Sequence, residues 1–93
     1  MKIVLRPLGT LQQYFGDSRV EIDCSAEITF FQLCEAIGER WGGILPTGFW
    51  NPTTRRFAPQ VLVISGGIEL DKQADPLLTE GQEIIILLPS AGG

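Results

Sequence analysis

One stretch of the chain, residues 30–41, has the apolar spacing of a long helix, whereas the other apolar segments are short and strand-like. Its apolar side chains recur at i, i+3, i+4, i+7 and i+11, one face of a helix with 3.6 residues per turn; they are Phe30, Leu33, Cys34, Ile37 and Trp41. Such a stripe is typical of a core-facing helix. Thr29 is a suitable N-cap, and Gln32 would complete a capping box. We expect Gly42-Gly43 to end the helix, with a left-handed glycine at its C-terminal cap.

Five shorter segments have the composition of β-strands, and they are residues 2–8, 20–24, 61–64, 68–71 and 83–88. The residues from Val20 to Cys24 alternate strictly between apolar and polar, as a half-buried strand does. A turn signal at residues 16–19 predicts that the first two strands form a hairpin. Pro7 restricts the first strand to a sheet edge or to the end of a ladder.

The order strand, strand, helix, strand, short strand, strand predicts an α+β fold: a mixed sheet of four to five strands with one main helix on one face. We expect a single domain over residues 1–93. One helix covers only one face of a sheet, yet the segments 61–64 and 84–88 are apolar at every position. Half of these side chains should point away from the helix and leave an apolar patch, which usually marks a partner surface. Burial of this set under a long loop is the alternative.

Residues 42–60 form a segment with three prolines and three glycines, which predicts a long loop. Loops of this length are uncommon in compact domains and are often functional. Trp50, Arg55, Arg56 and Phe57 are therefore candidates for a contact surface. Alternatively, the aromatic residues close one end of the core while the arginines are solvated.

Composition and charge argue against several partners. The chain has 93 residues, of which 44% are hydrophobic and 19% charged, as in an ordinary globular domain. The net charge of −4 argues against nucleic acid or an anionic membrane as the main partner. No apolar run reaches the roughly 20 residues that span a bilayer. The apolar run at residues 3–5 is too short for a signal peptide, so we expect a cytoplasmic protein.

The sequence offers no machinery for autonomous catalysis. Histidine is absent, as are the HExxH, P-loop and GxSxG motifs. We therefore expect no enzyme activity of its own, no bound cofactor and no metal site. Cys24 and Cys34 fit no metal-binding spacing and are interpreted as reduced structural thiols, although the sequence alone leaves a disulfide between them open.

The last five residues are Pro89, Ser90, Ala91, Gly92 and Gly93, directly after an apolar strand. Proline ends the strand, and the small residues after it predict a flexible tail over residues 89–93. Fully extended, these residues would reach about 17 Å. The reactive group at the tip would be the α-carboxylate of Gly93, which another enzyme would have to activate, for instance as an acyl-adenylate. The tail is thus interpreted as a substrate arm; a frayed end without function is the alternative.

Two segments resemble a known family. Residues 75–84, DPLLTEGQEI, are similar to the "PL-x-(D/E)-G-D-E-V" segment of the MoaD family, the small subunit of molybdopterin synthase, and residues 88–93, LPSAGG, to its "P-P-x-x-G-G" end. Residues 63–66, VISG, stand where the family has a "V-N-G" turn. The chain departs from the pattern at Leu88, at Ser65 and by one added residue between Pro76 and Gly81, and its 42–60 loop is longer than in compact members.

The resemblance implies a ubiquitin-like β-grasp fold and the function of a sulfur carrier. An ATP-dependent activating enzyme would adenylate Gly93, and a sulfur donor would convert it to a thiocarboxylate. The tail would then enter the large subunit of molybdopterin synthase and donate sulfur. ATP and the catalytic residues would belong to these partners. The docking face would use Leu87, which matches a patch position of the family, together with Ile85, Val63 and Ile68.

Three other readings stay open. Sulfur carriers of thiamin synthesis have a similar end, usually with a third glycine, and Ala91 in that place favours the molybdopterin branch. A ubiquitin-like modifier would instead form an isopeptide bond through Gly93. A β-grasp interaction module with an inert tail is the third possibility.

Overall fold

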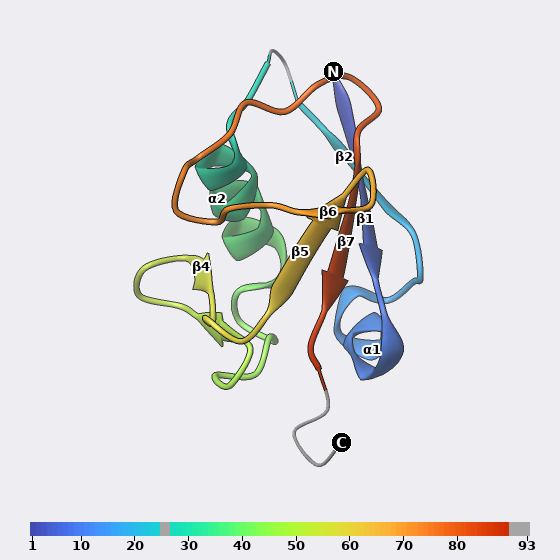
Figure 1. The fold of residues 1–93 in the computed structure, drawn as a ribbon. Helices are drawn as coiled ribbons and strands as arrows, with labels where there is room; N and C mark the ends of the chain where they lie inside the picture. The colour runs from blue at the N-terminus through green and yellow to red at the C-terminus, as the bar shows by residue number, and fades with distance from the viewer. Residues whose placement is uncertain (25–26, 90–93) are drawn as a thin grey trace.

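The computed structural model describes residues 1–24 and 27–89, and it consists of one mixed sheet with one main helix, α2 (Phe30–Trp41), on one face (Figure 1). The sheet order is β2-β1-β7-β5-β6. The strands are β1 (Lys2–Pro7), β2 (Val20–Asp23), β5 (Leu62–Ser65), β6 (Ile68–Glu69) and β7 (Glu83–Leu87). The predicted α+β layout is confirmed.

Strand β1 lies inside the sheet, antiparallel to β2 and parallel to β7. Pro7 is the last paired residue of β1, so it lies at the end of a ladder, one of the two positions that the sequence allows for it. The predicted hairpin of β1 and β2 is confirmed, but its connection contains two short helices that we did not predict, η1 (Gly9–Leu11) and α1 (Gln12–Phe15). They bury Leu11 and Phe15, so tertiary packing rather than local periodicity explains them.

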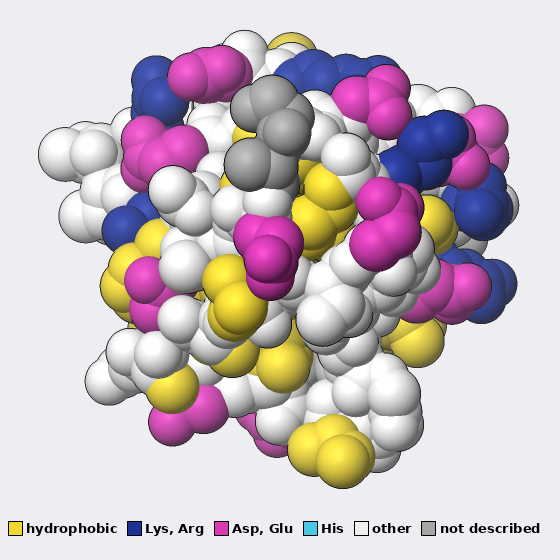
Figure 2. Space-filling model, turned by 90° about the horizontal axis from the view of Figure 1, so that it is seen from above, with side chains coloured by type: hydrophobic (Ala, Val, Ile, Leu, Met, Phe, Trp, Pro, Cys, Tyr) yellow, Lys and Arg dark blue, Asp and Glu magenta, His cyan; other side chains and the backbone are white. Residues whose placement is uncertain are grey.

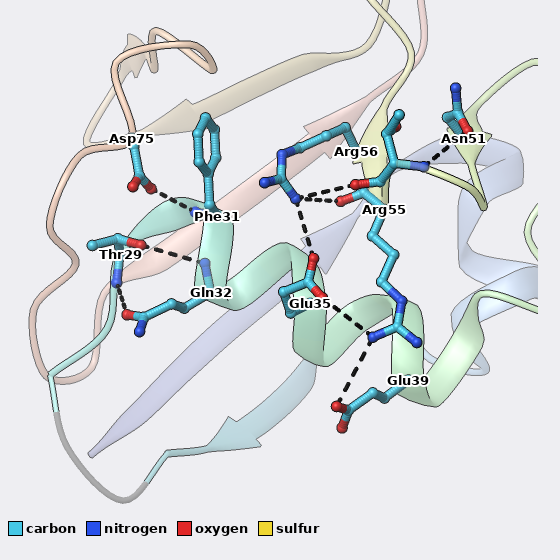
Figure 3. Close-up of polar contacts among 10 residues, drawn as sticks. Thr29, Phe31, Gln32, Glu35, Glu39, Asn51, Arg55, Arg56 and Asp75 are labelled. Carbon is cyan, nitrogen blue, oxygen red and sulfur yellow. Dashed lines mark hydrogen bonds and ion pairs between the residues drawn. The ribbon is translucent and has the colours of Figure 1, made fainter.

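Helix α2 begins with the predicted capping box (Figure 3). The Gln32 N–H donates to Thr29 Oγ1 at 3.3 Å, and the Thr29 N–H donates to Gln32 Oε1 at 2.8 Å. The prediction of a left-handed C-terminal cap is wrong, since Gly42 has a φ of −57°. The chain instead continues in a right-handed turn, in which the N–H groups of Ile44 and Leu45 both bond to the Trp41 carbonyl.

The core lies between α2 and the sheet face that it covers. The apolar stripe of the helix is buried as predicted, with Leu33, Cys34 and Ile37 fully inaccessible. Its partners on the sheet come from the three central strands, and they are Ile3, Leu5, Val63, Ile84 and Ile86, all 0% exposed. Alternate residues of β7 face this core, which leaves the others for the opposite face of the sheet.

The segment 42–60 contains a small hairpin, β3 (Trp50–Asn51) paired with β4 (Arg56–Phe57), which we did not predict. The rings of Trp50 and Phe57 are buried and meet edge to face at 5.0 Å between centroids. The aromatic residues thus close one end of the core. Arg55 and Arg56 are not free in solvent, because both pair with Glu35 of α2, at 3.3 and 3.4 Å (Figure 3).

On the face that Figure 2 shows, acidic and basic side chains lie interspersed, with hydrophobic groups between them. Neither sign of charge dominates this view. In residues 1–24 and 27–89, no helix is long and apolar enough to cross a membrane. The thiols of Cys24 and Cys34 are both free, in line with the structural reading of the two cysteines.

Candidate functional site

The sheet face turned away from α2 carries an apolar surface, which we call the outer patch: Leu62, Ile64, Ile85 and Leu87. These residues pair directly across β5 and β7, Leu62 with Leu87 and Ile64 with Ile85. Directly paired residues of an antiparallel ladder share one face, so the four side chains form one continuous surface. All four are partly exposed, whereas their neighbours Val63, Ile84 and Ile86 are fully buried. The patch that the sequence predicts is therefore present.

Charged pairs border the outer patch on the side of β1. Arg6 is the parallel partner of Ile85 and forms an ion pair of 3.4 Å with Glu83. Farther along, Lys2 pairs with Glu21 at 3.2 Å. Hydrogen bonds from Arg19 and Lys2 lower the pKa of Glu21. The apolar area thus has a polar rim, the usual arrangement of a protein-binding surface.

Of the four predicted docking residues, two lie in the outer patch, one is buried in the core and one is exposed away from the patch. Ile85 and Leu87 belong to the outer patch. Val63 does not: it pairs with Ile86, is 0% exposed and faces α2, so its assignment to the docking face is wrong. Ile68 is 72% exposed but pairs with Ser65, which lies on the same side of β5 as Val63, so it is separate from the patch.

The sequence reasoning missed Leu62 and Ile64. The segment from Val61 to Ile64 is apolar at every position, so it carries no signal of which residues face outward. The pairing register with β7 supplies that information, because Leu62 and Ile64 stand opposite the outward residues of β7.

Strand β7 leads from the outer patch toward the glycine pair. The strand ends at Leu87, and the side chains of the next two residues, Leu88 and Pro89, are exposed. The predicted tail residues Ser90, Ala91, Gly92 and Gly93 lie outside the described residues. The structure therefore shows the start of the tail at the edge of the patch and leaves its tip as a prediction.

The described residues offer little catalytic chemistry. Within residues 1–24 and 27–89, no group of three or more acidic, histidine or cysteine side chains could hold a metal ion. Burial raises the pKa of the Cys34 thiol to about 12, which leaves it protonated and unreactive at neutral pH. Burial also raises the pKa of the Cys24 thiol.

No family model and no curated protein matches the sequence. Solved structures do match over nearly the whole chain. SAMP1 from Haloferax volcanii superimposes with a TM-score of 0.78 at 15% identity and covers 100% of both chains. The HVO 2177 protein of the same organism superimposes with a TM-score of 0.72 at 22% sequence identity, and the match covers 100% of this chain and 87% of that chain. A putative molybdopterin converting factor, subunit 1, from Pyrococcus furiosus superimposes with a TM-score of 0.70 at 16% sequence identity. This match covers 97% of this chain and 99% of that chain.

The chain has the ubiquitin-like β-grasp fold. At these identities the likeness establishes the fold alone. In this β-grasp domain, the outer patch lies on the sheet face opposite α2, and strand β7 carries half of the patch and leads to Leu88 and Pro89. One side of the domain thus carries both an exposed apolar surface and the exposed residues Leu88 and Pro89 that follow β7.

Proposed function

We propose that this protein is a sulfur carrier whose Gly93 is adenylated by a partner enzyme and converted to a thiocarboxylate, as the small subunit of a molybdopterin synthase. The carrying observation is that Ile85 and Leu87, half of the outer patch, belong to the strand that continues through Leu88 and Pro89 toward the glycine pair. A partner seated on the patch would receive the following residues in its own active site. The β-grasp fold, shared with a putative converting factor subunit, supports this reading.

The chemistry of a terminal carboxylate explains why partners are required. An α-carboxylate has a pKa of about 3.3–3.7 and is ionised at neutral pH, so nucleophiles attack it poorly. In the proposed cycle a carboxylate oxygen of Gly93 attacks the α-phosphate of ATP, and pyrophosphate leaves. Sulfide-level sulfur from a donor then displaces AMP and leaves the thiocarboxylate. The activating enzyme, the donor and the large synthase subunit supply the catalytic groups.

A ubiquitin-like modifier is the second candidate. The structural likeness to SAMP1, small archaeal modifier protein 1, favours it. The first step would be the same adenylation. A lysine amine would then attack the acyl-adenylate, displace AMP and form an isopeptide bond. A carrier of sulfur for another pathway, such as thiamin synthesis, shares every step up to the thiocarboxylate.

Intact-mass spectrometry of the protein from its native cells tests the proposal. We expect a species that ends at Gly93 and is heavier by the mass difference between sulfur and oxygen. Conjugates of Gly93 to lysines without any thiocarboxylate would favour the modifier. A mature chain that does not end at Gly93, or that never carries either modification, would overturn both candidates.

Deletion of Gly93 tests the role of the tip directly. The activating enzyme of the same cells should release pyrophosphate from ATP with the wild-type chain, and the truncated chain should support no sulfur transfer. Ser90→Ala is the matched control, since it alters the tail without changing its length or its end. Sulfur transfer by the truncated chain would contradict the carrier role.

A further inference from the structure

A concave site lies on the helix side of the sheet, away from the outer patch. It is a cavity of about 260 Å³ between the first turn of α2, strand β4 and residues 72–73. Phe30, Phe31 and Phe57 form its aromatic part, with Phe30 and Phe57 stacked at 6.3 Å between ring centroids. Phe30 and Phe57 are buried, whereas Phe31 is partly exposed, so Phe31 supplies most of the aromatic surface that a ligand could reach.

Two cationic side chains line the same cavity, Arg56 and Lys72. The Lys72 ammonium donates to the backbone carbonyls of Pro59, at 3.1 Å, and Val61. An ammonium has three protons to donate, so one remains for a ligand. Among residues 1–24 and 27–89, no carboxylate lies within ion-pair distance of Lys72, whose protein hydrogen bonds there go to the two carbonyl oxygens.

The guanidinium of Arg56 lies over the Phe31 ring, with 4.1 Å between Cζ and the ring centroid (Figure 3). In the described part of the chain its hydrogen bonds all use Nη1, which donates to the carbonyls of Thr54 and Arg55 and to Glu35. Its Nη2 and Nε groups therefore keep donors for a ligand. Arg56 shares the Glu35 carboxylate with Arg55, which also contacts Glu39 at 4.0 Å, so in the described part of the chain Arg56 has only a share of one carboxylate as its ion-pair partner.

Two acidic groups close to the cavity are already engaged in the fold. The Asp75 carboxylate accepts the Phe31 N–H at 2.7 Å, and the Asp71 carboxylate accepts the Gln73 N–H at 2.9 Å. Neither residue lines the cavity. In a chain of net charge −4, the cavity thus combines an aromatic floor with two cations and no lining carboxylate.

We propose that this cavity binds a segment of a partner protein that places an apolar side chain on the phenylalanines and a neighbouring carboxylate against Lys72 and Arg56. The volume is below the roughly 300–1,000 Å³ of small-molecule sites, which suits one or two side chains better than a cofactor. The site lies on the helix side of the sheet, so a partner on the outer patch leaves it free. The inference does not depend on the sulfur-carrier proposal.

A blocked dipeptide, N-acetyl-phenylalanyl-glutamate amide, is the probe, and the amide NMR spectrum of the full chain is the readout. We expect saturable shifts at Phe31, Phe57 and Gln73 in the millimolar range. The glutamine analogue of the peptide tests the charge and should bind about fivefold more weakly, the effect of one partly exposed ionic contact. Absence of saturable shifts at these residues, or equal binding of both peptides, would overturn the proposal.

Variants of the protein test the same contact from the other side. Lys72→Met removes the charge but keeps an apolar stem, and should weaken binding of the glutamate peptide about fivefold with little effect on the glutamine peptide. Lys72→Arg should bind as the wild type does. Lys2→Met is the matched control, because it removes one positive charge on the far side of the sheet. Weakening by Lys2→Met as large as that by Lys72→Met would show a general charge effect and refute the site. If Lys72→Met fails to fold, the comparison of the glutamate and glutamine peptides on the wild type and on Lys72→Arg still tests the proposal.

Discussion

The Asp75 carboxylate accepts a hydrogen bond of 2.7 Å from the backbone N–H of Phe31, a residue 44 positions earlier in the chain (Figure 3). The adjacent Pro76 carbonyl accepts the Phe30 N–H at 2.9 Å, and Thr29 accepts the Gln32 N–H. The first N–H groups of α2, which have no partner within the helix, are all satisfied in this way. The Asp75-Pro76 segment that resembles the carrier family therefore has a structural role at the start of the helix.

Replacement of Asp75 should destabilise the domain without affecting the outer patch. Asp75→Ala removes the acceptor for Phe31 and leaves an alanine at a φ of 52°, a left-handed conformation that favours glycine, asparagine and aspartate. We expect the free energy of unfolding to fall by about 1–2 kcal/mol, measured by urea denaturation. Asp75→Asn keeps both the acceptor and a residue tolerant of this φ, and should lose less than half as much. Equal losses in the two variants would show that the hydrogen bond is not the cause.

Local signals in the sequence predicted the helix and its N-cap, but not this contact. The stripe from Phe30 to Trp41 and the pair of Thr29 and Gln32 lie within a few residues of each other, and the physics that links them is local. Asp75 is far away in sequence, and no spacing rule connects it to Phe31. The helix ends at Trp41, before Gly42-Gly43, as predicted, and only the left-handed conformation of its cap is wrong, because the chain continues in a right-handed turn that leads to the buried Leu45.

The sequence predicts that an outer patch exists, but it identifies only some of the residues that form it. A sheet covered on one face must leave its other face open, and the segments 61–64 and 84–88, apolar at every position, make that face apolar. Which residues face outward depends on the register, and a shift of one residue exchanges the two faces. Val63 was misplaced for this reason. The β3–β4 hairpin was missed because each strand has only two residues, held by the packing of Trp50 and Phe57 rather than by pattern.

A charge in the outer patch should affect partner binding far more than folding. Leu87 is partly exposed at the end of β7, so Leu87→Asp should cost no more than about 1 kcal/mol of stability, whereas Ile86→Asp buries a charge in the core and should cost at least about 3 kcal/mol. We expect Leu87→Asp to weaken binding of the activating enzyme, measured by calorimetry. Ile44→Asp is the matched control, because Ile44 is exposed outside the patch. Unfolding of Leu87→Asp, or equal binding defects in Leu87→Asp and Ile44→Asp, would contradict the docking face.

The buried thiol of Cys34 should make the domain less stable at alkaline pH. Burial raises the pKa of Cys34 to about 12, above its value of about 8.5 in an unfolded chain. At a pH between these two pKa values, the unfolded state has lost the thiol proton and the folded state keeps it. The contribution of Cys34 to the free energy of unfolding is therefore complete below about pH 8.5 and decreases as the pH rises above that value. The slope from this group approaches about 1.4 kcal/mol per pH unit. Cys34→Ala should be less stable at pH 7 but show a flatter decline between pH 8.5 and 10 in urea titrations; an unchanged slope would refute the assignment.

At Gly38, helix α2 lies close to the segment that carries Arg55. A Cβ atom at Gly38 would lie 2.9 Å from Cδ of Arg55 and 3.2 Å from Cζ2 of the buried Trp50. Gly38→Val should therefore push Arg55 away from Glu35, disturb the packing of Trp50 and lower the free energy of unfolding by about 1–3 kcal/mol. Gly43→Val is the matched control, since nothing lies within 4 Å of a Cβ there, and it should change stability by less than about 0.5 kcal/mol. Urea denaturation followed by tryptophan fluorescence measures both effects, and equal stability of the two variants would show that the approach at Gly38 does not constrain the fold.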